Sequence, residues 1–385
     1  MMEPPVSLIP RDEGGAVSLV AKRAAPRERL QGMTPERLVE RMNAIESLSA
    51  AQRPTLDEAR RIIAHVVQRA SDVALGVRNV RATARDAAFS NIGVGKLTLV
   101  ERHASTVDPF VKYLFECEDG ARIETVRIPL HKAGRFSVCV SSQVGCALGC
   151  RFCATGTMGL VRHLAAWEIV EQVRHVSREL REEGLGRVHG VVFQGMGEPL
   201  HNVDNVLDAL DVITNPCGVA VDGRAVTVCT AGIVPGIRAM AQRGTRARLA
   251  ISVTTARPEV RRSLMPIEKK YPLAEVLDAA REFFLQNNRL VMLSFALMAG
   301  VNTTDEDAAA LAEAIGVGTD RALPVRLSLV EHNAFEGTPF VRPSAEEFGR
   351  FVDALGRLGV PVVRRYSGGG DIGAACGQLV VERDQ

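Results

Sequence analysis

Apolar residues recur beyond Phe136 in two alternating patterns. Short apolar runs of the kind that form buried strands lie near 136–140, 188–194, 225–230, 247–253, 289–297 and 323–330, with a last short run near 360–364. Segments with helical apolar spacing lie between them, near 165–181, 203–214, 235–243, 272–286, 304–316 and 344–358. These six alternations of strand and helix predict parallel strands with crossover helices, since hairpins cannot join parallel neighbours. The fold class we expect is α/β, as an open or closed barrel.

The first part of the chain has a different pattern. Residues 1–30 are punctuated by proline and glycine, which predicts a flexible tail. Helices are expected over 34–49 and 55–70, because Thr34 is a suitable N-cap and Thr55 with Glu58 matches a capping box. Three β-type runs between 95 and 128 predict a small antiparallel sheet. The expected organisation is a tail (1–30), a helical accessory domain that binds RNA (31–94), a β extension (95–130) and the barrel (131–380).

Composition narrows the class of protein. The 385 residues carry a net charge of +2, which neither requires nor excludes a nucleic-acid partner. No apolar stretch approaches the ~18 residues of a membrane span, and no secretory leader is evident at the start. Eight cysteines are too few for a disulfide scaffold in a chain of this length. We therefore expect a cytoplasmic protein without a membrane partner, in which grouped cysteines serve metal binding and catalysis.

The candidate chemistry is concentrated in the loop Gly145-Cys146-Ala-Leu-Gly-Cys150-Arg-Phe-Cys153. Three cysteines in a short loop with small residues can bring three thiolates to one iron–sulfur cube, and one iron is then left open for another ligand. A structural zinc site is the alternative, but zinc requires a fourth ligand. No second Cys or His pair stands at zinc-finger spacing near the loop, although His131 and His163 flank it loosely.

Other polar motifs follow the predicted strands one by one. They are Gly195-Met-Gly-Glu198-Pro199, Cys229-Thr-Ala-Gly232, Ser252-Val253-Thr254 and Glu331-His-Asn333. Because the carboxyl ends of parallel strands meet at one mouth of a barrel, these motifs should gather around the cysteine loop. Two glycines beside Glu198 would let the backbone approach a ligand closely.

Together these motifs resemble the RlmN/Cfr family of radical S-adenosylmethionine (SAM) RNA methyltransferases. The matching segments span about 95–380 and include Glu124-Thr-Val, Val138-Cys139-Val-Ser-Ser-Gln, Cys150-Arg-Phe-Cys153, Gly195-Met-Gly-Glu-Pro, Leu264-Met-Pro-Ile and Ala375-Cys376-Gly-Gln-Leu. The resemblance implies a partial (β/α)6 barrel and one 4Fe-4S cluster held by Cys146, Cys150 and Cys153. It also implies two SAM molecules per turnover, held by Gly197, Glu198, Cys229, Ser252, Val253, Thr254 and Asn333.

The resemblance further implies a mechanism for an electron-poor adenine carbon. Cys376 would carry the methyl group as S-methylcysteine and become linked to the base, Glu124 would accept the ring proton, and Cys139 would release the product by forming a transient disulfide with Cys376. Without the other motifs, Cys139 and Cys376 could equally be interpreted as small buried side chains with no catalytic role, and Glu124 as an exposed strand residue.

The expected activity is methylation of carbon 2 of an adenosine in 23S ribosomal RNA, with transfer RNA as a second candidate. Methylation of carbon 8, as in the Cfr branch, and a non-catalytic RNA-binding or ribosome assembly factor remain alternatives. A low-potential donor such as flavodoxin would supply electrons to a monomer. The chain departs from the family at Cys229, where serine is common, at Thr254, where histidine is usual, and at Ser367-Gly-Gly-Gly370, which replaces a more charged segment.

Overall fold

The computed structural model describes residues 28–381. The strands are β1 (Thr98–Ala104), β2 (Val111–Glu116), β3 (Arg122–Pro129), β4 (Arg135–Val140), β5 (Gln143–Cys146), β6 (Gly159–His163), β7 (Arg187–Phe193), β8 (Val226–Thr230), β9 (Arg248–Ser252), β10 (Val291–Leu297), β11 (Val325–Glu331) and β12 (Val362–Arg364). The helices are α1 (Pro35–Asn43), α2 (Leu56–Val67), α3 (Ala82–Asn91), α4 (Ala154–Thr157), α5 (Ala166–Glu182), α6 (Val203–Thr214), α7 (Val234–Gln242), α8 (Pro258–Leu264), α9 (Leu273–Asn287), α10 (Asp305–Ile315) and α11 (Ala345–Gly356).

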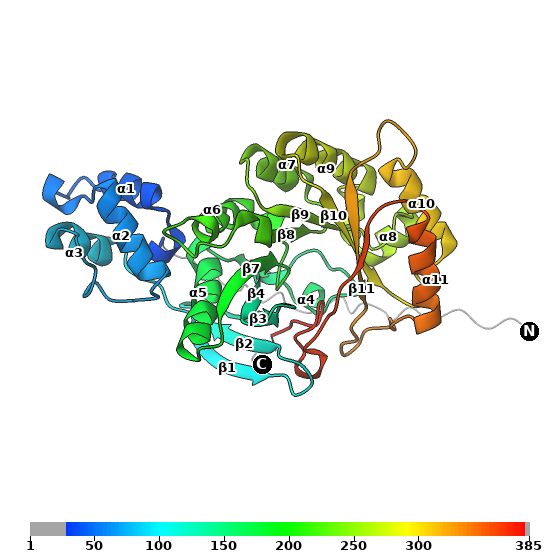
Figure 1. The fold of residues 1–385 in the computed structure, drawn as a ribbon, viewed down its shortest axis with the longest axis horizontal. Coiled ribbons are helices and arrows are strands. Elements are labelled where there is room, and N and C mark those ends of the chain that lie inside the picture. The colour runs from blue at the N-terminus through cyan, green and yellow to red at the C-terminus, as the bar shows by residue number, and fades with distance from the viewer. Residues whose placement is uncertain (1–27, 382–385) are drawn as a thin grey trace, which may run out of the picture.

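One large sheet organises the molecule. Its strand order is β1-β2-β3-β4-β7-β8-β9-β10-β11-β12, and every pair from β4 to β12 is parallel. Helices α5, α6, α7, α9, α10 and α11 lie outside the curved parallel part (Figure 1). The α/β fold with alternating strands and helices is therefore confirmed.

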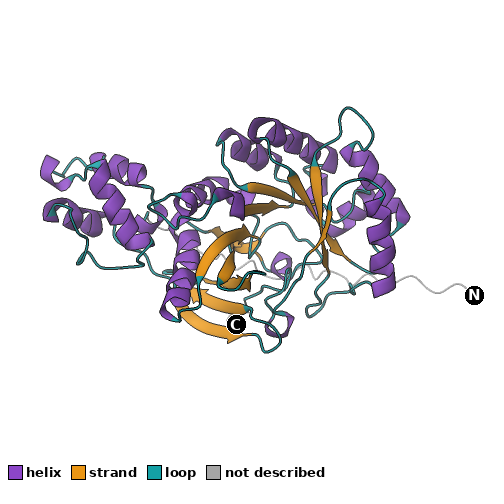
Figure 2. Ribbon diagram, viewed as in Figure 1, coloured by secondary structure: helices purple, strands orange, loops and turns teal. Residues whose placement is uncertain are grey.

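The predicted β extension exists, but it is part of the main sheet. Strands β1, β2 and β3 pair antiparallel, and β3 continues antiparallel onto β4 with Val126 opposite Cys139. The expected antiparallel strands therefore continue the main sheet, because β3 uses the edge of β4 that the parallel strands leave free. Figure 2 shows this edge of the sheet running on from the barrel.

Local capping explains where several helices begin. The Thr34 hydroxyl accepts a hydrogen bond from the Arg37 amide, and Thr55 and Glu58 form the expected capping box. Helices α1 to α3 form a group at one end of the molecule (Figure 1). Sequence reasoning did not predict α3, because it is rich in alanine and has little separation of polar and apolar faces.

The core lies between the parallel sheet and its helices. Phe193 on β7, Phe283 on α9 and Phe295 on β10 are almost completely buried there, while Trp167 on α5 is buried against Gly32 and Gly95. Burial of such apolar side chains is the main favourable contribution to folding. Within residues 28–381, no helix combines the length and the apolar character needed to cross a membrane.

Candidate functional site

The cysteine loop is held by a short hairpin that sequence reasoning did not predict. Cys146 ends β5 and pairs with Gly159 of β6, while Cys153 directly precedes α4. Gly145 has φ +73°, and a Cβ there would lie 1.9 Å from the carbonyl oxygen of Gly159. The close approach of the two strands therefore requires glycine next to the first cysteine.

The three cysteine thiols line one cavity of about 150 Å³. Burial raises the pKa of the Cys146 thiol to about 12 and raises the pKa of the Cys150 and Cys153 thiols above its ordinary value. Within the described part of the chain, no three His, Cys, Asp or Glu side chains are grouped as a ready-made metal site. The donor set of three thiols nevertheless fits an iron–sulfur cluster, whose binding would replace the thiol protons and draw the sulfurs together.

Glu198 contributes a buried carboxyl group to the same cavity. Its Oε1 accepts a hydrogen bond from the Leu200 amide at 3.0 Å and its Oε2 accepts one from the Ala231 amide at 2.8 Å. Burial raises the pKa of Glu198 to about 7 despite these two donors. Gly197, with φ +98°, also lines the cavity and approaches the side chain of Gln143.

The ends of β8 and β9 supply the next group of predicted residues. Cys229, Ser252 and Thr254 all line the cavity, and burial raises the pKa of the Cys229 thiol to about 12. Val253 is fully buried and does not line the cavity. Its amide donates to the carbonyl oxygen of Ser294 at 2.9 Å, so it connects β9 to β10 instead.

Cys376 enters the cavity from the far end of the chain. Its carbonyl oxygen accepts a hydrogen bond from the Asn333 side-chain amide at 3.1 Å, and its own amide donates to the Ser367 hydroxyl at 3.1 Å. The loop is also tied to the cysteine loop, because the Ala154 amide donates to the carbonyl oxygen of Gly377 at 2.7 Å. Asn333 therefore both lines the cavity and positions the loop that carries Cys376.

A second cavity, of about 270 Å³, shares Cys376, Gly377 and Gln194 with the first. Cys139 and Cys376 both line it, although they are far apart in the sequence. Burial raises the pKa of the Cys139 thiol, and the nearby Cys376 and Cys229 act in the same direction. Cys376 thus stands between a cavity that contains the cysteine loop and a cavity that contains Cys139.

Glu124 on β3 lines neither of the two cavities. Its Oε1 lies 2.7 Å from Lys112 Nζ, and its Oε2 accepts a hydrogen bond from the Val380 amide at 2.8 Å. Burial raises the pKa of this carboxyl group, while the charge of Lys112 opposes the rise. Its neighbours do line the second cavity: Val126 is two residues further along β3, and Leu379 precedes Val380.

Two arginines near the site, the part-buried Arg365 and the fully buried Arg261, were missed at the sequence level. Arg365 lies with Nη2 3.9 Å from the Cys376 sulfur and donates through Nη1 to the Gln194 side chain at 3.0 Å. Arg261 forms a buried ion pair with Glu268 and donates to the carbonyl oxygen of Ala231 at 2.9 Å. Arginine side chains are normally expected at the surface, so neither residue stood out. The sequence signals that could have pointed to the site were the nearness of Arg365 to Cys376 and of Arg261 to Leu264-Met-Pro-Ile.

Comparison with known proteins agrees with this geometry. The model of the radical SAM superfamily matches residues 140–315, a range that contains the cysteine loop. The crystal structure of a radical SAM methyltransferase from Sphaerobacter thermophilus aligns with a TM-score of 0.81 and 34% identity, covering 92% of this chain and 99% of that one.

Curated relatives point to one chemistry. A Sorangium cellulosum protein named "Probable RNA methyltransferase" is 48% identical, over 87% of this chain and 90% of that protein. The dual-specificity RNA methyltransferase RlmN of Anaeromyxobacter sp. strain Fw109-5 is 41% identical, over 74% of this chain and 75% of that protein. The same strain has a second relative, named "Probable RNA methyltransferase", that is 46% identical over 84% of this chain and 93% of that protein.

Proposed function

The chain belongs to the RlmN-type family of radical SAM RNA methyltransferases, and on this premise we propose that it methylates carbon 2 of an adenosine in 23S ribosomal RNA, with transfer RNA as a second substrate. The observation that carries the proposal is the position of Cys376, which lines both the cavity of the cysteine loop and the cavity of Cys139. A residue that receives a methyl group on one side and presents it to a base on the other needs such a position.

Membership of the radical SAM family implies a 4Fe-4S cluster and SAM. We propose Cys146, Cys150 and Cys153 as the cluster ligands. The SAM-binding residues we propose are Gly197, Glu198, Cys229, Ser252, Thr254 and Asn333, which line the same cavity, together with Val253, whose contribution would be to hold the backbone of this loop. When bound, the reduced cluster and SAM supply a 5'-deoxyadenosyl radical, and two SAM molecules are consumed per turnover in this proposal. A flavodoxin-like donor would supply the electron.

The protein side chains then have distinct tasks. Cys376 accepts a methyl group on sulfur and becomes bonded through that carbon to the adenine. Glu124 takes the proton from the ring carbon; its buried carboxylate would reach the base only if Lys112 or the Val380 amide releases it. The Cys139 thiolate attacks the sulfur of Cys376, and the bond from that sulfur to the transferred carbon breaks. The carbon keeps the electron pair and takes up a proton to become the methyl group of the product, and a disulfide remains between the two sulfurs. The positive charge of the part-buried Arg365 guanidinium lowers the pKa of the Cys139 thiol and so favours the thiolate that this attack requires.

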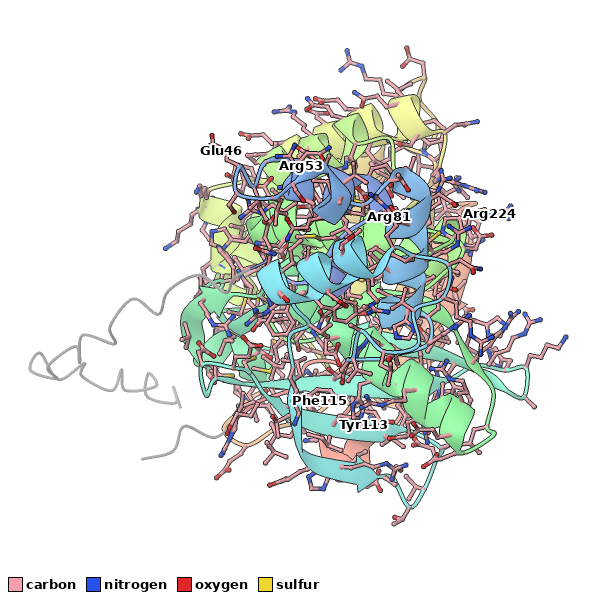
Figure 3. All side chains as sticks on the ribbon, turned by 90° about the vertical axis from the view of Figure 1, so that its left-hand side faces the viewer. Glu46, Arg53, Arg81, Tyr113, Phe115 and Arg224 are labelled. Atoms are coloured by element: carbon pink, nitrogen blue, oxygen red, sulfur yellow. The ribbon has the colours of Figure 1, made fainter. Side chains whose placement is uncertain are left out.

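RNA binding is assigned to the helical accessory domain, residues 31–94. Arg60, Arg69 and Arg78 are exposed there and have no ion-pair partner among the residues that the structure describes. Figure 3 shows this end of the molecule, where Arg53 and Arg81 also lie, although Arg81 is paired with Glu58 at 2.7 Å. Replacing the three exposed arginines by glutamine should weaken RNA binding and reduce its dependence on salt concentration.

Methylation of carbon 8 is the second candidate, and one observation favours it. Anaeromyxobacter sp. strain Fw109-5 has two relatives, and this chain is more similar to the one that is not named RlmN, at 46% against 41% identity. Two proteins in one cell suggest two different modifications. We expect a cytoplasmic monomer in either case.

The experiment is anaerobic reconstitution with iron and sulfide, followed by incubation with SAM, a reductant and ribosomal RNA or transfer RNA. Mass spectrometry against nucleoside standards should detect 2-methyladenosine, whereas 8-methyladenosine would support the second candidate. Cys376→Ala should abolish the product and leave RNA binding intact. Unmethylated RNA with both wild-type and variant protein would instead support a non-catalytic RNA-binding factor.

A further inference from the structure

Tyr366 is an unusual aromatic side chain in this protein. It is 73% exposed, and no other Phe, Tyr or Trp within residues 28–381 is found among the exposed large apolar side chains. It lies two residues beyond the end of β12 and precedes Ser367, whose hydroxyl accepts a hydrogen bond from the amide of Cys376. A single exposed apolar side chain needs no explanation by itself, but this ring is also held in place and lines a cavity with Cys376.

The ring of Tyr366 is fixed in place although it is exposed. Its hydroxyl donates a hydrogen bond to Asp108 Oδ2 at 3.0 Å, and the same oxygen accepts one from the Gly369 amide at 2.9 Å. The ring also packs edge-to-face with Phe110, with 6.1 Å between the ring centroids. A ring held in this way loses little conformational entropy when a ligand binds to it.

Tyr366 and Cys376 share a cavity. Both line the cavity of about 270 Å³, together with Phe110 and the buried Cys139. The cavity therefore extends from an exposed aromatic ring to the two buried or half-buried thiols. A nucleotide whose base reaches Cys376 must place its neighbours in the chain close to Tyr366.

The charges around Tyr366 select which part of an RNA can lie there. Asp108 binds its hydroxyl, and Asp371 accepts hydrogen bonds from the Ser105 hydroxyl at 2.7 Å and the Thr106 amide at 2.9 Å. The two carboxylates beside the hydroxyl end of the ring repel phosphate groups but not an uncharged base, and the positive charge of Arg365, which lines the same cavity, lies beside Cys376 instead. The favourable contact for RNA at this place is stacking of a nucleobase.

We infer that Tyr366 is a stacking platform for the nucleobase next to the target adenosine, and that it positions the RNA strand so that the target base enters the cavity of Cys376. This inference rests on the proposed function. Tyr366 acts through binding and takes no part in bond formation.

The test compares Tyr366→Ala and Tyr366→Phe with wild-type protein. The measurements are KM and kcat for methylation of a 23S ribosomal RNA fragment, and the Kd for the same fragment. Stacking on one aromatic side chain corresponds to about 5- to 150-fold in binding, so Tyr366→Ala should raise Kd and KM within this range. Tyr366→Phe keeps the ring and loses only the hydrogen bond to Asp108, and it should restore most of the affinity. Leu285→Ala, which removes a 78% exposed side chain on α9, is the matched control and should have no effect.

A second arm uses RNA fragments with an abasic residue on either side of the target. Wild-type protein should bind one of these fragments with the same raised Kd that Tyr366→Ala shows for intact RNA. The Kd of Tyr366→Ala should be the same for this fragment and for intact RNA. Equal losses in Tyr366→Phe and Tyr366→Ala would overturn the inference, because they would mean that the hydroxyl only fastens the loop. Unchanged affinity in Tyr366→Ala, with methylation by wild-type protein intact, would overturn the inference alone. Absence of methylated adenosine with wild-type protein would overturn the proposed function, and the inference with it.

Discussion

Gly145→Ala is the substitution that tests the hairpin beneath the cysteine loop. An added Cβ would lie 1.9 Å from the carbonyl oxygen of Gly159, and the two strands would have to separate by about 1 Å to reach the 3.0 Å below which real contacts are not found. Alanine at φ +73° also costs ~1–2 kcal/mol of folding free energy, and the forced contact adds ~1–3 kcal/mol. Because Cys146 is the next residue, the movement should disturb cluster binding more than the overall fold.

Gly184→Ala is the matched control for this substitution. Gly184 has φ +66°, and a Cβ there would meet no atom within 4 Å, so the variant carries the backbone cost without the contact. Iron and sulfide per chain after anaerobic reconstitution, together with the thermal midpoint of unfolding, distinguish the two. Gly184→Ala should load iron as the wild type does, whereas Gly145→Ala should lose most of it. Equal iron loading in the two variants would refute the reasoning.

Three further predictions concern buried polar groups. Burial raises the pKa of Glu198 from 4.5 to about 7, so protonation of this carboxyl group favours the folded state. The free energy of unfolding of the cluster-free protein, measured by urea titration, should therefore fall by ~3 kcal/mol as the pH rises from 4.5 to 7. The same titrations of Glu198→Gln should lack this dependence on pH. Arg261→Ala leaves Glu268 buried without its partner and should cost ~3–5 kcal/mol in the same assay, while a loss below 1 kcal/mol would show that the pair is solvated. Cys139→Ala should accumulate a covalent protein–RNA adduct visible on a denaturing gel, and free methylated product without adduct would exclude its role in release.

The parallel part of the fold could be predicted because each element is encoded locally. The strand expected near 188–194 is β7 (Arg187–Phe193), and the helix expected over 203–214 is α6 (Val203–Thr214). The hairpin of β5 and β6 could not be predicted, because its short strands owe their pairing to the close contact at Gly145 and not to an apolar alternation. The pairing of β3 with β4 depends on which free strand edge is available in the folded sheet, and no local sequence pattern determines this.

The candidate site divides in a similar way. Motifs after successive strands gather in one cavity because parallel topology brings their carboxyl ends together, and this is why Cys150, Glu198 and Asn333 could be grouped from the sequence, whereas Cys376 was found only through the family resemblance. Val253 was included by its place in a motif, but alternation along the strand turns its side chain into the core. The position of Arg365 beside Cys376 depends on how the last loop folds back over the barrel, which the sequence around it does not indicate.

Transfer of a methyl group through Cys376 is the central claim, and isotopic labelling tests it most directly. Protein produced in cells supplied with methyl-deuterated methionine would carry the label on Cys376 after removal of free SAM. One turnover with unlabelled SAM, reductant and ribosomal RNA under anaerobic conditions then separates the possible sources of the methyl carbon. The account predicts deuterium in the first methyladenosine formed, with loss of the label from Cys376. Unlabelled methyladenosine, with the deuterated methyl group still on the protein, would contradict it.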